Sequence, residues 1–414
     1  MIYIPVCYFT AFFLFQLKKR KTICNIGSII TAYYVVSSAF SILYYKAING
    51  EMVDLHIVPT ILYCLLLSLT IYPFYKIDIR NKVFRTFDND NRTFHVISWI
   101  LIILCLMFFA YILSSVMGAL RGDLGRIRRS TYFEDNAVSF PWYIYPAVYA
   151  KEFSPIILLF FFYSITFMKN SRIFNALLLF SSIVLPISGI VSAARTQVIY
   201  WLMTASVLLM IFWPHMSRGS KRFTGFFVLG LSIIALLYIE LVTVSRFQSF
   251  ANDSIISYIG QPYVQFCNVF NHYSFDGHIT FNRIFPITSK YIFGNNFNVR
   301  TYRAYHTARI GTQTGVFLTY LGDAMLDFGK IGMVIYAFVV WIIEKIFIKR
   351  INTKDLNLSS LIIMTILFRI PLLGIFAYMY LSIATSVMII GSIVFAYFFS
   401  NIKFVINRAR TLQR

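Results

Sequence analysis

The chain has 414 residues, of which 58% are hydrophobic and 13% are charged, and its formal net charge is +21. A soluble protein of this length carries about a quarter charged residues, so the composition excludes a soluble enzyme, and we expect no nucleic acid as a partner. The apolar residues form blocks of roughly twenty, the length that crosses a hydrocarbon core of about 30 Å. Because a backbone in lipid has no water to bond, such blocks are helices. We predict an all-α, polytopic transmembrane bundle that forms a single membrane domain over residues 1–414.

The apolar blocks predict about eleven spanning helices. They lie at residues 1–17, 26–45, 57–75, 95–117, 153–168, 173–191, 196–213, 223–243, 328–347, 357–377 and 379–400. The first block is followed by the basic run 18–21, whereas a cleavable signal peptide places its positive charge before the apolar region. We therefore predict a retained first helix.

The basic residues indicate how the bundle is oriented. Segments 18–21, 76–94, 169–172, 215–222, 344–355 and 403–414 hold 22 of the 37 Lys and Arg residues but only 5 of the 16 acidic residues. Loops rich in Lys and Arg stay in the cytoplasm. We predict that the N-terminus lies outside and the C-terminus lies in the cytoplasm.

Two large segments are then predicted on the outer side, at 118–152 and, between helices eight and nine, at 245–327. The second is rich in Phe and Tyr, which favours short helices in the membrane interface. The predicted outer side carries 11 Arg but only 4 Lys. Guanidinium binds phosphate through two parallel donors, so this excess favours a phosphate site. Ion pairing with the 11 predicted outer acidic residues, and snorkelling to headgroups, are the alternatives.

The turn Ser192-Ala193-Ala194-Arg195-Thr196 lies between predicted helices six and seven. Ser192 is expected to cap the following helix, which leaves Arg195 in its first turn. A cation there opposes the helix dipole, but together with free backbone N–H groups it suits a bound phosphate. The alternative is an Arg195 that anchors the helix by snorkelling.

Arg369 lies inside an apolar block, two residues before Pro371, which is expected to kink the helix. An arginine at membrane depth faces a cavity or a partner, so Arg369 either lines a site or pairs with an acid such as Asp327. Asp323 and Asp327 are four residues apart. They bind a cation, or one of them caps a helix or pairs with a local arginine.

Residues 299–309 hold the densest basic cluster, with Arg300, Arg303 and Arg309 around His306. If this stretch is helical, Arg303 and His306 share a face. His306 is then a candidate general base, and the alternative is a solvated loop histidine. Arg246, which directly follows predicted helix eight, is a further candidate for the phosphate site.

The sequence contains no phosphate-binding loop, dinucleotide fingerprint or metal-ligand spacing, and its five cysteines form no paired framework. We predict no cofactor, no metal and no disulfide.

The arrangement resembles the Wzy-type polymerases of O-antigen, capsule and related repeat-unit polysaccharides. The likeness rests on the helix count, the turn 192–196, the large aromatic outer segment and two later stretches. These are Gly311-Thr312-Gln313-Thr314-Gly315-Val316-Phe317 and Leu326-Asp327-Phe328-Gly329-Lys330-Ile331-Gly332, the second similar to the family's Asp-Phe-Gly-x-x-Gly entry into a late helix. The sharper likeness covers residues 185–345.

The resemblance implies a GT-C-like glycosyltransferase of the bacterial cytoplasmic membrane that acts on its outer face. The donor would be a glycan on undecaprenyl pyrophosphate, and the acceptor the terminal sugar of a lipid-linked repeat unit. Outer arginines of this family hold the pyrophosphate, a role that carries over to Arg195 most directly and to Arg246, Arg303 and Arg309 less so. The partners are then the lipid-linked oligosaccharides and the bilayer, and whether a chain-length regulator protein is also a partner stays open.

Two other functions fit the same sequence. An O-antigen ligase shares the fold and the donor but transfers the glycan to lipid A core. A flippase of lipid-linked oligosaccharides, or another transporter, would need a polar path through the bundle, whereas the ionisable residues here concentrate in the predicted outer segments.

Overall fold

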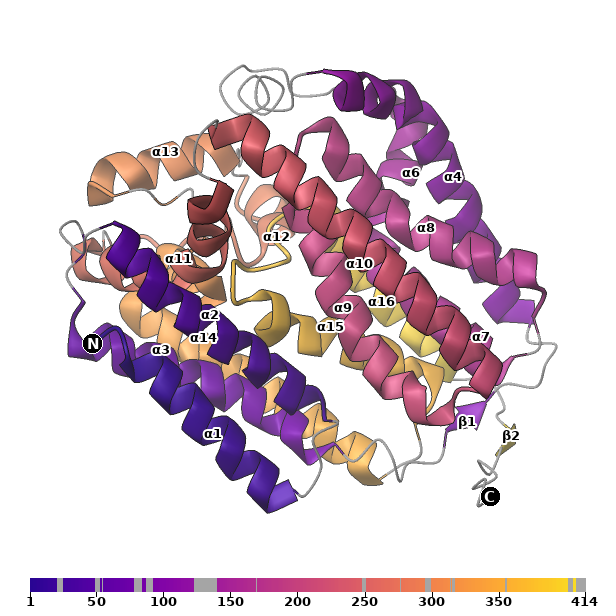
Figure 1. Ribbon diagram of the computed structural model, residues 1–414, viewed down its shortest axis with the longest axis horizontal. Coiled ribbons are helices and arrows are strands. Elements are labelled where there is room, and N and C mark those ends of the chain that lie inside the picture. Colours follow the sequence, from indigo (N-terminus) through magenta and orange to yellow (C-terminus); the bar gives the residue numbers. More distant parts are fainter. Residues whose placement is uncertain are drawn as a thin grey trace. The chain divides into compact units, whose positions relative to one another are not determined.

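The chain is described by a computed structural model over residues 1–20, 25–48, 53, 55–77, 84–86, 92–122, 140–168, 170–247, 251–275, 277–294, 299–312, 314, 317–353, 356–400 and 405–406. Nearly all of this part is helical (Figure 1). Within it, the strands are the two-residue β1 (Arg85–Thr86) and β2 (Val405–Ile406), which pair antiparallel. The predicted all-α class is confirmed.

The chain divides into two compact units, each made of several stretches of sequence. Unit 1 consists of Met1–Ile79, Asn252–Lys354 and Ile366–Ser386. Unit 2 consists of Arg80–Ala251, Asp355–Thr365 and Val387–Arg414.

Unit 1 is built from α1 (Ile4–Arg20), α2 (Ile26–Ala47), α3 (Ile57–Ile71) with the short η1 (Tyr72–Lys76), α11 (Ala251–His272), α12 (Pro286–Tyr291), α13 (Val299–Ile310) and α14 (Thr319–Thr353). Helix α11 falls in the segment predicted to hold short interfacial helices, yet it has 22 residues and packs tightly against α2. The Ser41 hydroxyl donates to the Gly260 carbonyl at 2.7 Å. A Cβ at Gly260 would lie 2.3 Å from the Phe40 carbonyl oxygen, so only glycine permits this approach.

Unit 2 is built from α4 (Arg92–Arg121), η2 (Trp142–Ile144), α6 (Tyr145–Ala150), η3 (Lys151–Phe153), α7 (Ser154–Phe167), α8 (Arg172–Val191), α9 (Thr196–Phe212), η4 (Trp213–His215) and α10 (Arg218–Phe247). Helix α7 is central, because every residue from Ser154 to Ser164 is buried. Two helices are shared between the units: α15 (Leu358–Leu373) begins in unit 2, and α16 (Ile383–Ser400) has most of its length there.

In the described part of the chain, nine helical stretches are long and apolar enough to cross a membrane. The chain is therefore a multi-pass membrane protein. Helices α1 and α15 coincide with two further predicted blocks but have only 17 and 16 residues. The predicted count of about eleven spans, the single domain and the orientation stay predictions.

Two boundaries differ from those predicted, and the differences are linked. Helix α14 begins at Thr319 rather than at 328, and the chain between α15 and α16 is non-helical over 374–382 rather than turning at 378. Pro371 lacks an N–H and so removes one hydrogen bond from the last turn of α15, which ends two residues later. The backbone N–H groups of Thr319 and Tyr320 donate to the carbonyls of Phe376 and Gly374 at 3.0 and 2.9 Å. The start of α14 thus satisfies carbonyl groups of the link 374–382.

Candidate functional site

In unit 2, the turn 192–195 connects α8 to α9, as predicted. Ser192 does not cap α9, however, and that prediction is wrong. Ser192 is the C-terminal cap of α8, where its hydroxyl donates to the Gly189 carbonyl at 3.3 Å. The chain then reverses through Ala193, whose φ is +47°, so that Arg195 itself occupies the N-cap position of α9 and makes no side-chain cap bond.

Arg195 is nearly buried, with 6% of its surface exposed. Burying a cation costs hydration free energy, and the dipole of α9 opposes a cation at this end. A bound anion would offset both costs, since the first backbone N–H groups of a helix and a guanidinium are both donors to phosphate.

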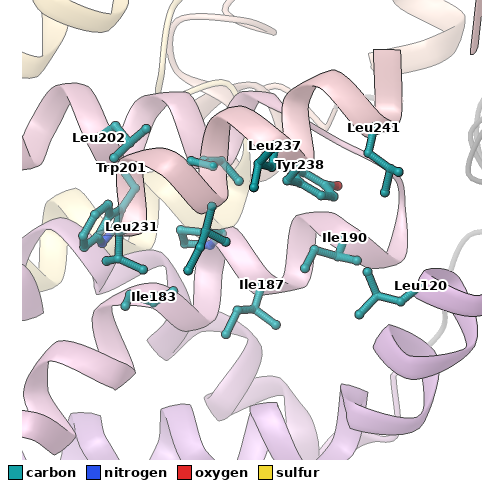
Figure 2. Close-up of a pocket in the computed structure, with 14 residues that line it drawn as sticks. Leu120, Ile183, Ile187, Ile190, Trp201, Leu202, Leu231, Leu237, Tyr238 and Leu241 are labelled. Carbon is teal, nitrogen blue, oxygen red and sulfur yellow. The ribbon is translucent and has the colours of Figure 1, made fainter. Parts of the chain in front are cut away.

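A groove of about 460 Å³ opens beside this turn, between α8, α9 and α10 (Figure 2). Its lining is almost entirely apolar and includes Ile187 and Ile190 of α8, Trp201 of α9, and Tyr238 of α10. The Tyr238 hydroxyl donates to the carbonyl of Ala194 at 3.5 Å. The groove therefore ends next to the turn that carries Arg195.

In unit 1, the side chain of Asp327 joins three segments. Its Oδ1 accepts hydrogen bonds from the hydroxyls of Thr280 at 2.9 Å and Tyr302 at 2.8 Å. Its Oδ2 accepts from the backbone N–H groups of Arg283 at 2.7 Å and Ile284 at 2.8 Å. Asp327 thus fixes the segment 280–284 and α13 to the first part of α14, which is a supporting role.

Asp323 forms a buried ion pair with Arg283. The guanidinium Nη2 lies 2.8 Å from Oδ1, and Oδ2 accepts from the backbone N–H of Tyr378 at 2.6 Å. Of the alternatives for the two aspartates, pairing with a local arginine therefore holds for Asp323. Arg283 was not among the predicted site residues; its signal was a single cation between Phe281 and Phe285, in a chain with two acids four residues apart.

His306 lies in the same cluster as Asp327. Residues 299–310 are helical, as the proposed shared face required, and His306 is 4% exposed rather than solvated. Its ring centroid is 4.3 Å from that of Tyr302, the residue that donates to Asp327. Burial, and then the neighbouring Asp327 carboxyl, raise the pKa of Tyr302 well above its ordinary value. Tyr302 therefore keeps its proton and stays a hydrogen-bond donor to Asp327.

Arg369 belongs to the same polar region of unit 1. It is 3% exposed, and its guanidinium carbon lies 5.9 Å from the ring centroid of Tyr380. The Tyr380 ring lies 5.6 Å from that of Tyr378, whose backbone is bonded to Asp323. The four hydrogen bonds of Asp327 come from other groups. The structure therefore favours a position of Arg369 beside this cluster over an ion pair between Arg369 and Asp327.

The other predicted arginines are less informative. Arg309 is half-buried, donates to the Ser274 carbonyl and lies over the Tyr273 ring, so it ties α13 to the chain after α11. Arg246 belongs to α10, and Arg300 and Arg303 belong to α13. The side chains of these three residues lie outside the described part of the structure. That Arg195 and the arginines of unit 1 bind one ligand stays a prediction.

Among the described residues, no three His, Cys, Asp or Glu side chains come together as metal ligands. No protein-family model, no curated protein and no solved structure matches the chain. The resemblance to Wzy-type polymerases, with its GT-C-like fold, therefore stays an expectation from sequence.

Proposed function

We propose that the protein is a polysaccharide repeat-unit polymerase of a bacterial cytoplasmic membrane. It transfers a glycan from undecaprenyl pyrophosphate to the terminal sugar of a lipid-linked repeat unit on the outer face. The observation that carries the proposal is the nearly buried Arg195 at the start of α9. A guanidinium in that place is stabilised by an anion, and the leaving group of this reaction is a pyrophosphate.

In this reaction the anomeric C–O bond to pyrophosphate breaks, and a new C–O bond forms to a hydroxyl of the acceptor sugar. The hydroxyl proton passes to a base, and the lipid pyrophosphate leaves with the bonding electron pair. The protein must stabilise the charge that develops on the leaving oxygen and orient the acceptor hydroxyl. A fixed guanidinium performs the first task because it keeps its charge at any accessible pH.

His306 is the candidate base, and Tyr302 and Asp327 hold α13, which carries it. Arg369 and Arg283 add positive charge to the same region, although Arg283 is already paired with Asp323. The two arginines and two aspartates of this cluster balance in formal charge.

Purified protein in detergent, supplied with lipid-pyrophosphate repeat units, should lengthen the glycans without a membrane gradient. A flippase could not do this, because it moves lipid-linked glycans without joining them. Repeat units that keep their length in this assay, with folded protein, would rule out the polymerase.

The role of Arg195 can be tested by substitution. Arg195→Ala should abolish polymer while the membrane level of the protein stays near normal, and Arg195→Lys should restore activity only in part, since an ammonium lacks the planar fork. Arg172→Ala is a matched control, because Arg172 also begins a helix, α8, but is exposed. Full activity of Arg195→Ala would remove this residue from the site.

The ligase alternative differs in its cellular phenotype. Deleting a polymerase leaves lipopolysaccharide with a single repeat unit, whereas deleting a ligase leaves bare core. Bare core after deletion would replace our proposal with the ligase.

A further inference from the structure

The groove between α8 and α10 is elongated and lies along both helices. On α8 its lining residues Ile183, Ile187 and Ile190 repeat at helical spacing and so form one stripe. On α10 the lining extends from Leu231 to Leu241, which is about 15 Å of helix. Figure 2 shows Tyr238 and Leu241 facing Ile187 and Ile190 across the open space.

Two apolar stripes at this spacing would ordinarily interdigitate, because helix interfaces in proteins are close-packed. Here about 460 Å³ remains open between them. A cavity of about 150 Å³ already accepts benzene, so the groove has room for a hydrocarbon of roughly three times that size. Its length and its apolar lining suit a flexible chain rather than a sugar or a polar solute.

The positive charge of Arg195 near one end of the groove indicates which kind of lipid binds there. The bond from Tyr238 to the carbonyl of Ala194 places the end of the groove one residue from Arg195. Arg195 does not itself line the groove, but a lipid whose hydrocarbon lies along α10 would bring its headgroup to the turn that carries Arg195. A zwitterionic phospholipid also carries an ammonium or choline cation, which the same guanidinium repels.

We infer that the groove between α8, α9 and α10 binds the isoprenoid chain of a polyprenyl phosphate or pyrophosphate, with the phosphate beside Arg195. The inference rests on the proposed function for the identity of the lipid. It goes further by assigning the hydrocarbon-binding residues and the direction of the chain, from Leu241 near the turn toward Leu231.

Trp201 lines the groove and serves as a reporter. A variant in which the other four tryptophans are changed to Phe would be placed in vesicles of phosphatidylcholine with brominated chains, which quench tryptophan on contact. Added polyprenyl phosphate, which carries no bromine, should displace the brominated chain and restore the Trp201 fluorescence. The polyprenyl alcohol should be much weaker, because it lacks the phosphate.

Ala235→Phe should fill the groove, since Ala235 lines it and is nearly buried. Displacing two or three methylene groups from the groove corresponds to a loss of about tenfold or more in apparent polyprenyl phosphate affinity. Leu236→Phe is the matched control, because Leu236 is the next residue of α10 and is 64% exposed outside the groove. Ile187→Phe is a second filling variant from the facing helix, for the case that Ala235→Phe fails to fold.

The outcomes separate this inference from the proposed function. The inference would be wrong if polyprenyl phosphate did not restore the Trp201 fluorescence, or restored it equally in wild type and in the filled variants. Bilayer phospholipid would then be the occupant of the groove. Polymer synthesis at the wild-type rate in a folded Ala235→Phe protein would also overturn it, while supporting the polymerase. If polyprenyl phosphate restores the fluorescence of wild type but not of the two filled variants, and the wild-type protein joins no repeat units, the lipid-binding groove is supported and the polymerase is refuted.

Discussion

The guanidinium Nη2 of Arg283 lies 2.8 Å from Oδ1 of Asp323, and the two side chains are only 3% and 1% exposed. Removing one partner of such a pair leaves a buried charge, whereas replacing both with apolar groups removes the problem. The ion pair therefore makes a clear prediction about stability.

Asp323→Asn should lower the free energy of unfolding by about 3–5 kcal/mol, measured from denaturation of the purified protein in detergent. The double variant Arg283→Met, Asp323→Leu should recover only part of that loss, because the backbone N–H of Tyr378 loses its acceptor. Arg218→Gln, at the exposed start of α10, is the control and should change stability by no more than about 0.5 kcal/mol. A double variant no more stable than Asp323→Asn would contradict this account.

Replacing the Asp327 carboxyl group with an amide should destabilise the protein. In Asp327→Asn, the carboxamide NH₂ replaces one oxygen and faces two donors, either the two hydroxyls or the two backbone N–H groups. Each donor left unsatisfied costs about 1–3 kcal/mol, so the variant should unfold at a clearly lower temperature in detergent. An unchanged melting temperature would show that these bonds contribute little.

Tyr302→Phe should cost about 1–2 kcal/mol, because it deletes the hydrogen bond to Asp327 and a longer one to Thr280. Because the pKa of Tyr302 is raised above its ordinary value of about 10, the phenol keeps its proton in both the folded and the unfolded chain below about pH 9. Its contribution is fully present there and is lost only as the pH rises through the folded-state pKa. The difference between wild type and Tyr302→Phe should thus be constant from about pH 8 to 9, and a difference that shrinks across this range would argue against a permanent donor.

Gly329 should be irreplaceable within the Asp-Phe-Gly sequence at residues 327–329. Its φ of 76° and ψ of 177° break α14 between two helical parts, and a Cβ there would lie 2.9 Å from the Phe275 ring. Gly329→Ala should cost at least about 1–3 kcal/mol. Gly230→Ala, in the interior of α10 with open space around its Cβ, should instead stabilise by about 0.5–1 kcal/mol. Thermal denaturation of both variants measures this difference. Equal changes in melting temperature would contradict the requirement for glycine at the kink.

Glu344 is fully buried in α14, and among the described residues neither of its carboxyl oxygens has a hydrogen-bond partner. A buried polar group without a partner costs about 1–3 kcal/mol in protein variants. Glu344→Leu should therefore raise the melting temperature, whereas Glu240→Leu, at an exposed position of α10, should leave it nearly unchanged. A destabilised Glu344→Leu protein would mean that the carboxyl is satisfied after all.

The helices themselves could be predicted from sequence because apolar blocks are bounded by polar residues. The predicted helix at 173–191 is Arg172–Val191 in the structure, and the predicted helix at 196–213 is Thr196–Phe212. The start of α14 could not be predicted in this way. Asp323 and Asp327 interrupt the apolar pattern over 319–328, and their partners Arg283 and Tyr302 come from distant sequence, so local composition favoured a loop.

The candidate site was predicted in part for the same reason. The position of Arg195 follows from a short turn between two strong helices, which local sequence specifies. The pairing of Arg283 with Asp323 depends on how α14 packs against the segment 280–284, and no local pattern distinguishes this arginine from the other ten on the predicted outer side. The groove is likewise a property of the space between helices, which hydropathy does not report.

The bonds from Thr319 and Tyr320 to Phe376 and Gly374 join stretches that leave the ribosome at different times. Helix α14 can enter the bilayer early, but the N–H groups of Thr319 and Tyr320 have no acceptor until more than fifty further residues have been synthesised. The carboxyl of Asp323 waits in the same way for the N–H of Tyr378. A nascent chain that stops before Gly374 would therefore leave the N–H groups of Thr319 and Tyr320, and one oxygen of Asp323, without their final partners.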